Sequence, residues 1–223
     1  MAHPDTQSAW RRGLRPYVGS NPSIDDAARL AARWLRSDAR MAGRHLIRNT
    51  LAGSAFTPRL LRWYLYRLSG LAIDTPNIAD HCVIRVSELS VGTGTYIGPR
   101  CYFEGLGPIT IGDDCLFGPG STLLTSHHAI DPGDGSFERL PEPRPVVVGD
   151  RVWVGAGCIL APGAVVEDDC VIGAGAVVIG RCAGGRTYGG VPARPLPASQ
   201  EGARAPGPRR RGVHEARVGD RSR

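Results

Sequence analysis

The sequence predicts an all-β solenoid, a parallel β-helix, and three observations support this fold class. A six-residue period runs from Val148 to Ala183, in which each hexapeptide begins with an aliphatic residue and has a small residue at its fifth position. The same frame appears upstream, between about residues 71 and 130. Gly and Pro occupy many other positions, where the chain must turn between short strands. Such repeats bury their lead residues only by stacking on the next coil.

The hexapeptides have aliphatic or aromatic leads in both runs. The C-terminal leads are Val148, Val154, Leu160, Val166, Ile172 and Val178, and the upstream leads are Val91, Ile97, Phe103, Ile111, Phe117 and Leu123, with fainter hexads at Ile78 and Ile84. A two-residue insertion separates Phe103 from Ile111. No helical periodicity interrupts these runs, so an α/β fold is not expected.

All six cysteines fall at the fifth position of a hexad: Cys82, Cys101, Cys115, Cys158, Cys170 and Cys182. Reduced Cys behaves as a small apolar residue, so we expect core thiols rather than three disulfides. The sequence also shows no signal-peptide segment and no long apolar run. Together these features predict a cytoplasmic location.

The 27 basic residues are all Arg, and they lie mainly outside the repeat. The net charge is +8 for residues 1–70, −6 for residues 71–200 and +4 for residues 201–223. Proteins that bind nucleic acid place their basic stripe on the folded surface, so no nucleic-acid partner is expected. We therefore predict a basic N-terminal segment (1–70), a β-helix domain (71–196) and a disordered Arg/Pro-rich tail (197–223).

Two amphipathic helices are expected in the N-terminal segment. A capping box formed by Ser23 and Asp26 precedes a first helix that runs to about Leu46. Thr57-Pro58 supplies an N-cap and a first-turn proline for a second helix, which Gly70 ends. We expect these helices to cap the open end of the β-helix, because a solenoid end has unpaired strand edges. Contact with a membrane surface is the less favoured alternative.

Residues 131–147 interrupt the repeat with Pro, Gly and charged residues, and we interpret them as a loop that projects from one coil. Two histidines, His127 and His128, stand just before it. Imidazole titrates near neutral pH, so a His at the edge of a rigid coil can remove a proton from an acceptor hydroxyl. Long loops in compact repeat domains are often functional.

Several segments together resemble the hexapeptide-repeat acyltransferases, most closely the maltose/galactoside O-acetyltransferase and polysaccharide acetyltransferase group. The segments are Ile109 to Cys115, Thr125 to Asp131, Val152 to Gly157 and the terminal Gly189-Gly190-Val191-Pro192-Ala193-Arg194. The resemblance spans about residues 71–196. It implies a left-handed β-helix with three hexads per coil, a homotrimer, and acetyl-CoA or another acyl-CoA bound between adjacent subunits.

The resemblance also implies the site residues. His128 is expected to be the general base, with His127 as the alternative, and no covalent acyl-enzyme is expected. The tautomer of His128 would be fixed by a hydrogen bond with His127, Asp131, Glu104 or a backbone carbonyl. Glu104 is also the candidate for acceptor binding. Gly98-Pro99-Arg100 replaces an Asn of the sugar acetyltransferases, so a maltose- or galactoside-like acceptor is not expected.

For the coenzyme, the matching positions are Trp153, Ala156, Ala174 and Arg194. The two alanines would offer backbone polar groups to the pantetheine arm, and the Arg194 guanidinium would pair with a phosphate. The sequence therefore predicts an acetyl-CoA-dependent O-acetyltransferase that acts on a small-molecule acceptor and uses no metal.

Two other functions remain open. A γ-carbonic-anhydrase-like enzyme would bind zinc through three histidines, for which His81, His127 and His128 are available. Adjacent histidines cannot easily converge on one ion from a strand, so this function is less favoured. A non-catalytic scaffold or partner-binding subunit would not need the terminal Gly-Val-Pro-Ala-Arg segment.

Overall fold

The computed structural model describes residues 24–133, 135–138 and 140–197, and the chain divides into two compact units between Leu46 and Ile47. The first unit contains helix α2 (Ile24–His45), which confirms the first predicted helix. Ser23 and the side chain of Asp26 lie outside the described part of the chain, as do residues 198–223 of the predicted tail. None of the described helices is long and apolar enough to cross a membrane.

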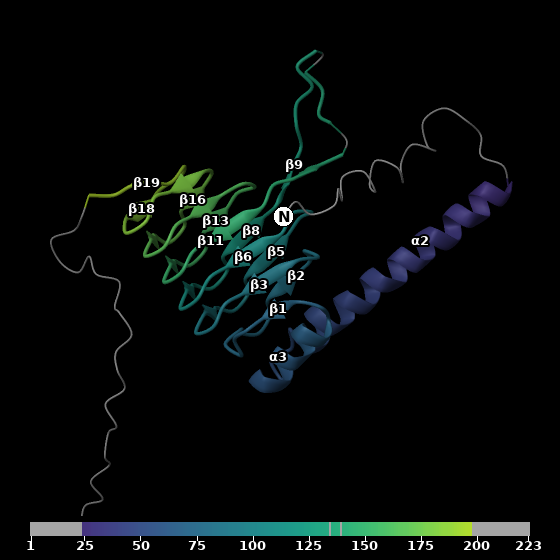
Figure 1. Cartoon of the computed structure of the whole chain (residues 1–223), viewed down its shortest axis with the longest axis horizontal. Coiled ribbons are helices and arrows are strands. Elements are labelled where there is room, and N and C mark those ends of the chain that lie inside the picture. The colour runs from purple at the N-terminus through teal and green to yellow at the C-terminus, as the bar shows by residue number, and fades with distance from the viewer. Residues whose placement is uncertain (1–23, 134, 139, 198–223) are drawn as a thin grey trace, which may run out of the picture. The chain divides into compact units, whose positions relative to one another are not determined.

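The second unit is a parallel β-solenoid of about six turns, as the sequence predicted (Figure 1). Three sheets form its faces, and the chain visits them in the order A, B, C. Sheet A contains β1 (Ala72–Ile73), β3 (Leu89–Val91), β6 (Ile109–Ile111), β11 (Val146–Val148), β14 (Val165–Val166) and β17 (Arg181–Cys182). Sheet B contains β4 (Tyr96–Ile97), β7 (Leu116–Phe117), β12 (Trp153–Val154), β15 (Val171–Ile172), β18 (Thr187–Gly189) and the antiparallel β19 (Arg194–Pro195). Sheet C contains β2 (Val83–Ile84), β5 (Tyr102–Glu104), β8 (Thr122–Leu124), β13 (Ile159–Leu160) and β16 (Val177–Val178).

The strand registers confirm the hexad leads. Val91 pairs with Ile111 in sheet A, Phe117 with Val154 in sheet B, and Phe103 with Leu123 in sheet C. The leads of both runs are buried and form one continuous core along the solenoid axis. Stacking like residues in this way removes each lead side chain from water only when the next coil is present.

All six cysteines are free and buried, as expected for core residues. One placement was wrong, however. Cys182 occupies an inward lead position in sheet A, where it pairs with Val166, rather than the fifth position of a hexad. The reason is that the chain passes from Val178 to Cys182 in four residues, two fewer than the period requires.

Changes in repeat length from Val91 onward fall at a single corner, the turn from sheet C to sheet A. Every step from sheet A to B and from B to C is six residues, as in Val91 to Ile97 to Phe103. The steps from sheet C to A are 8 residues from Phe103 to Ile111, 25 from Leu123 to Val148, 6 from Leu160 to Val166 and 4 from Val178 to Cys182. Irregular segments therefore gather along one edge of the solenoid.

Helix α3 (Arg59–Leu68) covers the first coil (Figure 1). It is the second predicted helix, and its position confirms that it caps this end of the solenoid. Trp63 Nε1 donates a hydrogen bond to the carbonyl oxygen of Ile73 in β1 at 2.8 Å. The N-cap is Pro58, not the predicted Thr57, because the Thr57 hydroxyl donates to the Leu51 carbonyl oxygen instead. Gly70, in the left-handed region with φ of 89°, follows the end of the helix as predicted.

Two arginines hold this cap in place by donating hydrogen bonds to backbone carbonyl oxygens. The π-helical turn η2 (Leu46–Leu51) contributes Arg48, whose guanidinium donates to the carbonyl oxygens of Val86 and Ser69. Arg62 of α3 is only 5% exposed and donates to four carbonyl oxygens, those of Ala52, Ser54, Thr57 and Ile78. These bonds satisfy backbone acceptors at the end of the solenoid, where the ladder has no further coil.

Candidate active site

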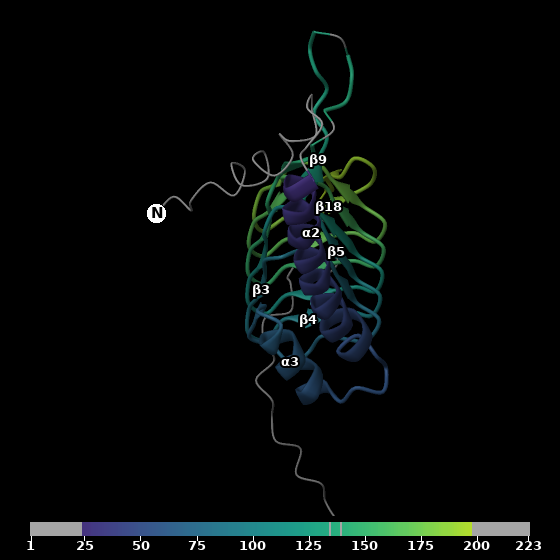
Figure 2. The same cartoon turned by 90° about the vertical axis from the view of Figure 1, so that its right-hand side faces the viewer.

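The longest turn from sheet C to sheet A forms an arm that projects from the stacked coils (Figures 1 and 2). Strands β9 (Ser126–His127) and β10 (Glu142–Pro143) pair antiparallel at its base, and Ile130 bridges to Phe137 farther out. The arm therefore starts earlier than the predicted loop of 131–147. Strand β11 resumes the solenoid at Val146, within the last residues of that range.

His128 lies exposed on the arm, directly after β9. Its Nδ1 atom is 2.9 Å from the carbonyl oxygen of Glu138 on the returning limb. A carbonyl oxygen only accepts hydrogen bonds, so Nδ1 must carry the proton, and Nε2 of the neutral ring is left with a free lone pair. Of the four groups considered for orienting this ring, the backbone carbonyl is the one that does so.

The other three orienting candidates have different partners. Asp131 accepts a hydrogen bond from the amide of Gly133, and His127 lies opposite Glu142 in the β9–β10 ladder. Glu104 ends β5, and its carboxylate accepts a hydrogen bond from the Tyr102 hydroxyl at 2.5 Å. Arg85 lies 3.8 Å from the same carboxylate. The bond to Glu104 raises the pKa of Tyr102, because it favours the protonated phenol.

Although Glu104 does not bond to His128, the backbone holds it at the base of the arm. Its carbonyl oxygen accepts a hydrogen bond from the amide of Thr125 at 2.9 Å. The carboxylate is partly exposed, with 42% of its side chain accessible. Glu104, Tyr102 and Arg85 thus form a polar cluster on the outer face of sheet C, beside the point where the arm leaves the coil.

The first three coenzyme candidates share sheet B and its corner with sheet C. Trp153 is exposed on the outer face of sheet B, where it pairs with Leu116 below and Val171 above. Ala156 and Ala174 occupy equivalent turns in successive coils, joined by a bond from Gly175 N–H to the Ala156 carbonyl oxygen. Within the described residues the amide N–H groups of Ala156 and Ala174 donate no hydrogen bond. Both are available to an external acceptor.

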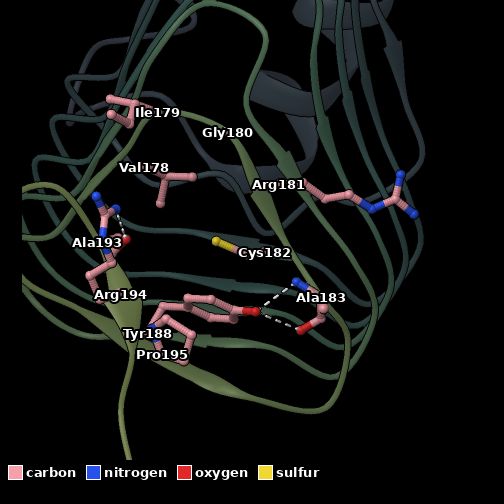
Figure 3. A pocket seen from close by; sticks show the side chains of 10 residues that line it. All are labelled: Val178, Ile179, Gly180, Arg181, Cys182, Ala183, Tyr188, Ala193, Arg194 and Pro195. Carbon is pink, nitrogen blue, oxygen red and sulfur yellow. Dashed lines mark hydrogen bonds between the residues drawn. The ribbon is translucent and has the colours of Figure 1, made fainter.

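Arg194 begins β19, which folds back on β18 at the C-terminal end of the solenoid. Its Nη1 donates to the carbonyl oxygen of Ala193, and no carboxylate in the described part of the chain pairs with it. Figure 3 shows Arg194 beside a pocket that Val178, Cys182 and Tyr188 also line. An exposed guanidinium without an acidic partner suits a phosphate group.

A single chain does not bring the two predicted halves of the site together. His128 and Glu104 lie at the corner from sheet C to sheet A, whereas Trp153, Ala156 and Ala174 lie on sheet B and its corner with sheet C. The three histidines proposed for zinc do not form one cluster either, since His127 and His128 are adjacent on the arm and His81 lies elsewhere. His81 lies in the turn before β2, in an early coil, and pairs with Asp80.

The sequence did not identify Tyr102, Arg85 or Glu138 as parts of these clusters. Tyr102 could have been found, because residues two apart on a strand face the same side and a phenol there can reach the Glu104 carboxylate. Arg85 belongs to the preceding coil, so its proximity depends on the length of the intervening corner. Glu138 contributes only its backbone, which leaves no signal in residue type.

Comparisons with known proteins agree with this fold and its repeats. Residues 145–180 match the family model described as bacterial transferase hexapeptide (six repeats), and residues 108–126 match the hexapeptide repeat of succinyl-transferase. Nodulation protein L of Rhizobium meliloti (strain 1021) is 30% identical over 151 residues, which cover 66% of this chain and 74% of that protein. Nodulation protein L of Rhizobium leguminosarum bv. viciae is 37% identical over 154 residues, covering 66% and 71%.

The coils and these matches define the class of protein as a hexapeptide-repeat transferase. Within this class, the chain belongs to the hexapeptide-repeat acyltransferase family and resembles its galactoside and polysaccharide acetyltransferases, as the sequence predicted. The galactoside O-acetyltransferase of Escherichia coli (strain K12) is 32% identical over 89 residues, which cover 39% of this chain and 42% of that enzyme.

Solved structures share the fold over most of the chain. A hexapeptide-repeat acetyltransferase from Vibrio cholerae, complexed with acetyl coenzyme A, has a TM-score of 0.59 at 21% identity and covers 72% of this chain and 87% of that one. A galactoside acetyltransferase in complex with coenzyme A has a TM-score of 0.58 at 21% identity, with coverages of 72% and 80%.

Proposed function

We propose that this protein is an acetyl-CoA-dependent O-acetyltransferase with His128 as its general base. The observation that supports this role most directly is the 2.9 Å contact between His128 Nδ1 and the Glu138 carbonyl oxygen. This contact leaves Nε2 of the neutral ring as a hydrogen-bond acceptor on an exposed side chain. A His that acts as a base must present an unprotonated ring nitrogen to the acceptor hydroxyl, and with the proton on Nδ1 that nitrogen is Nε2.

The proposed reaction moves one proton through His128. Nε2 takes the proton from the acceptor hydroxyl as its oxygen attacks the acetyl carbonyl carbon. Acetyl-CoA supplies the acetyl group as a thioester, whose C–S bond breaks as the new ester C–O bond forms. The protonated imidazole then returns the proton to the departing sulfur, so His128 ends neutral. Glu104, held at the base of the arm, is proposed to border the acceptor.

The coenzyme positions fit the chemical groups of acetyl-CoA. The unpaired amides of Ala156 and Ala174 can donate hydrogen bonds to the amide carbonyl oxygens of the pantetheine arm. Trp153 offers an exposed apolar surface beside them. Arg194, without a carboxylate partner among the described residues, can pair with a phosphate. The coenzyme complexes of the structural neighbours are consistent with this proposal.

We further propose a cytoplasmic homotrimer in which one copy contributes the His128 corner and its neighbour contributes the coenzyme surface. The separation of these two groups on one chain supports this arrangement, because a single copy offers only half of the site at either corner. Most soluble oligomers have closed cyclic or dihedral symmetry, which makes all such shared sites equivalent.

The test compares His128→Ala with His127→Ala in an assay of CoA thiol release over a panel of sugar and small-alcohol acceptors. We expect His128→Ala to lower kcat by about 100- to 10,000-fold, the usual contribution of a general base, with coenzyme binding intact. His127→Ala should retain most activity. Full turnover by His128→Ala with normal coenzyme binding would show that His128 is not the base.

A further inference from the structure

Helix α3 has large apolar or aromatic side chains on two opposite faces. One face packs on the first coil through Tyr66, which is fully buried, and Trp63, which is partly buried. The opposite face carries Leu60, Tyr64 and Leu68, which are 70%, 58% and 62% exposed. These three residues are spaced by four, so they form one row along the helix. A helix with apolar residues all round is normally covered on every side.

The exposed row extends beyond α3 into the turn that precedes it. Phe56 is 96% exposed, and Leu51 and Leu61 are about half exposed. The apolar face therefore consists of Leu51, Phe56, Leu60, Leu61, Tyr64 and Leu68. It lies at the end of the solenoid remote from β18 and β19 (Figure 1). Neither the core nor the candidate active site uses any of its six side chains. A concentration of exposed apolar residues marks an interaction surface.

The charge around this face favours an anionic partner. Residues 47–70 contain four Arg and no Asp or Glu. Two of these arginines, Arg48 and Arg62, are buried in the cap, while Arg59 and Arg67, near the two ends of α3, are exposed. Asp74 offsets one of them through a 2.8 Å ion pair with Arg67. Arg guanidinium groups bind phosphate with two parallel hydrogen bonds, so these exposed arginines suit phosphate headgroups.

A second copy of the chain fits this face less well than a lipid surface does. Two such faces placed together would add the positive charges of both copies, and although Asp74 offsets Arg67 in each copy, residues 47–70 contain no carboxylate to offset Arg59. A bilayer with anionic lipids accepts the Leu, Phe and Tyr side chains at its interface and neutralises the arginines at the same depth.

We propose that the apolar face of α3 docks the protein on the surface of an anionic phospholipid bilayer. Docking does not depend on the proposed acetyl transfer and involves none of its residues. The helix lies in the interface without crossing it, since α3 has only 10 residues.

The test uses the full chain and vesicle flotation. Vesicles of phosphatidylcholine with about 30% phosphatidylglycerol are expected to bind the protein, and pure phosphatidylcholine vesicles or high salt should weaken binding severalfold. The variant Leu60→Gln/Tyr64→Gln/Leu68→Gln should lower partitioning about tenfold or more, because three apolar side chains no longer insert. Phe137→Gln, which removes a 71% exposed aromatic from the arm, is the matched control and should bind normally.

A fluorescent probe at position 60 distinguishes lipid docking from burial of the apolar face by a second copy or by another part of the same chain. All six native cysteines are buried, so the thiol of Leu60→Cys can be labelled selectively with an environment-sensitive dye. We expect a blue shift only when anionic vesicles are added. A shift without vesicles that grows with protein concentration would identify a second copy as the occupant. A shift without vesicles at every protein concentration would show that another part of the same chain covers the face. In the flotation assay, unchanged binding of the triple variant would also overturn lipid docking.

Discussion

The Nδ1 atom of His128 and the carbonyl oxygen of Glu138 lie 2.9 Å apart, on the two limbs of one arm. The limbs are joined nearby by a second bond, from the Glu138 N–H to the carbonyl oxygen of Ala129 at 2.8 Å. The residue that orients the proposed base is therefore itself held in place through its backbone. Arm geometry and the tautomer of the neutral His128 ring are linked by these two contacts.

This link predicts that the backbone of residue 138, and not its side chain, affects catalysis. Glu138→Pro removes the N–H that bonds to Ala129 and displaces the carbonyl that faces His128. We expect kcat to fall by about tenfold or more, with the KM for acetyl-CoA nearly unchanged, since the coenzyme residues lie at another corner. Steady-state kinetics with both substrates measure this split.

Glu138→Ala is the matched control, because it retains both backbone groups. It should keep nearly full activity and the wild-type pH profile of kcat. A large loss in Glu138→Ala would instead implicate the carboxylate in the reaction. A normal kcat in Glu138→Pro would mean that the carbonyl contact does not set the reactive tautomer.

The coils were predictable from the sequence because a lead residue such as Val154 has a single way to leave water, which is to stack on Phe117 and Ile172. The same period located all six cysteines in the core. The period assigned Cys182 the wrong position within its hexad, however, because the corner before it is two residues shorter than the period requires. Counting hexads assumes that every turn between sheets has the same number of residues. Only the pairing of strands in the structure reveals which turn is shorter.

The candidate site was less predictable than the coils, for physical reasons that particular residues illustrate. A motif could nominate His128, but its partner is a backbone carbonyl ten residues farther along the chain, which any residue type could supply. The buried position of Arg62 was also hidden, because Arg is usually exposed and its acceptors here are backbone carbonyl oxygens, three between η2 and α3 and one at Ile78. Such contacts depend on how irregular segments fold, which periodicity does not describe.

The cap at the first coil is predicted to depend on the Arg62 guanidinium. Arg62→Met removes hydrogen bonds to four carbonyl oxygens, of which those of Ala52 and Ile78 lie in buried surroundings. We expect a loss of about 2–4 kcal/mol in the free energy of unfolding, because unsatisfied buried acceptors carry their full desolvation cost. Urea denaturation followed by circular dichroism measures the change.

Tyr66→Phe is a matched control on the neighbouring turn of the same helix. The Tyr66 hydroxyl is buried and has no hydrogen-bond partner among the described residues. Its removal should leave the free energy of unfolding unchanged or raise it slightly. Equal destabilisation by both variants would show that loss of packing in the cap, rather than loss of the Arg62 hydrogen bonds, explains the result.

The corner between sheets A and B is predicted to lose stability in acid. The Arg151 guanidinium, with contacts of 2.7 and 2.8 Å, lowers the pKa of Asp169, and the Gly184 amide followed by Arg181 lowers the pKa of Glu167. A carboxyl whose pKa is lower in the folded state stabilises the fold above its unfolded pKa of about 4, and this contribution is lost as pH falls through the folded pKa.

Melting temperatures between about pH 7 and pH 3 test this expectation with Arg151→Ala. The variant should melt below the wild type at neutral pH, and the two curves should converge in acid as Asp169 becomes protonated. The offset will be small, because both groups are exposed. Arg186→Ala, which removes an exposed Arg with no ion pair among the described residues, should follow the wild-type curve throughout. An Arg151→Ala offset that persists unchanged in acid would contradict the assignment.

The six thiols are expected to be unreactive in the folded protein because all six are buried, including Cys101, whose pKa is lowered by its hydrogen bond with Cys82. Burial raises the pKa of Cys115, Cys158 and Cys170, and raises that of Cys182 to about 11. Thiolate is the reactive form, so a disulfide reagent at about pH 8 should modify almost no cysteine in native protein. In denaturant it should modify all six. Rapid modification of the native protein would contradict the placement of the cysteines in the core.

The separation of His128 from the coenzyme surface predicts that two inactive variants can restore one another. His128→Ala lacks the proposed base, and Arg194→Glu places a carboxylate where a phosphate is proposed to bind. If each site uses His128 from one copy and the coenzyme surface from its neighbour, random mixing gives both intact halves to about a quarter of the sites. Co-expressed variants should therefore show about a quarter of the wild-type activity, while each variant alone shows almost none. If both halves instead came from one chain, every site in the mixture would contain a defect and no activity would return. Thiol-release assays on mixed and unmixed preparations of equal concentration distinguish the two outcomes, and size-exclusion chromatography with light scattering checks that both variants assemble.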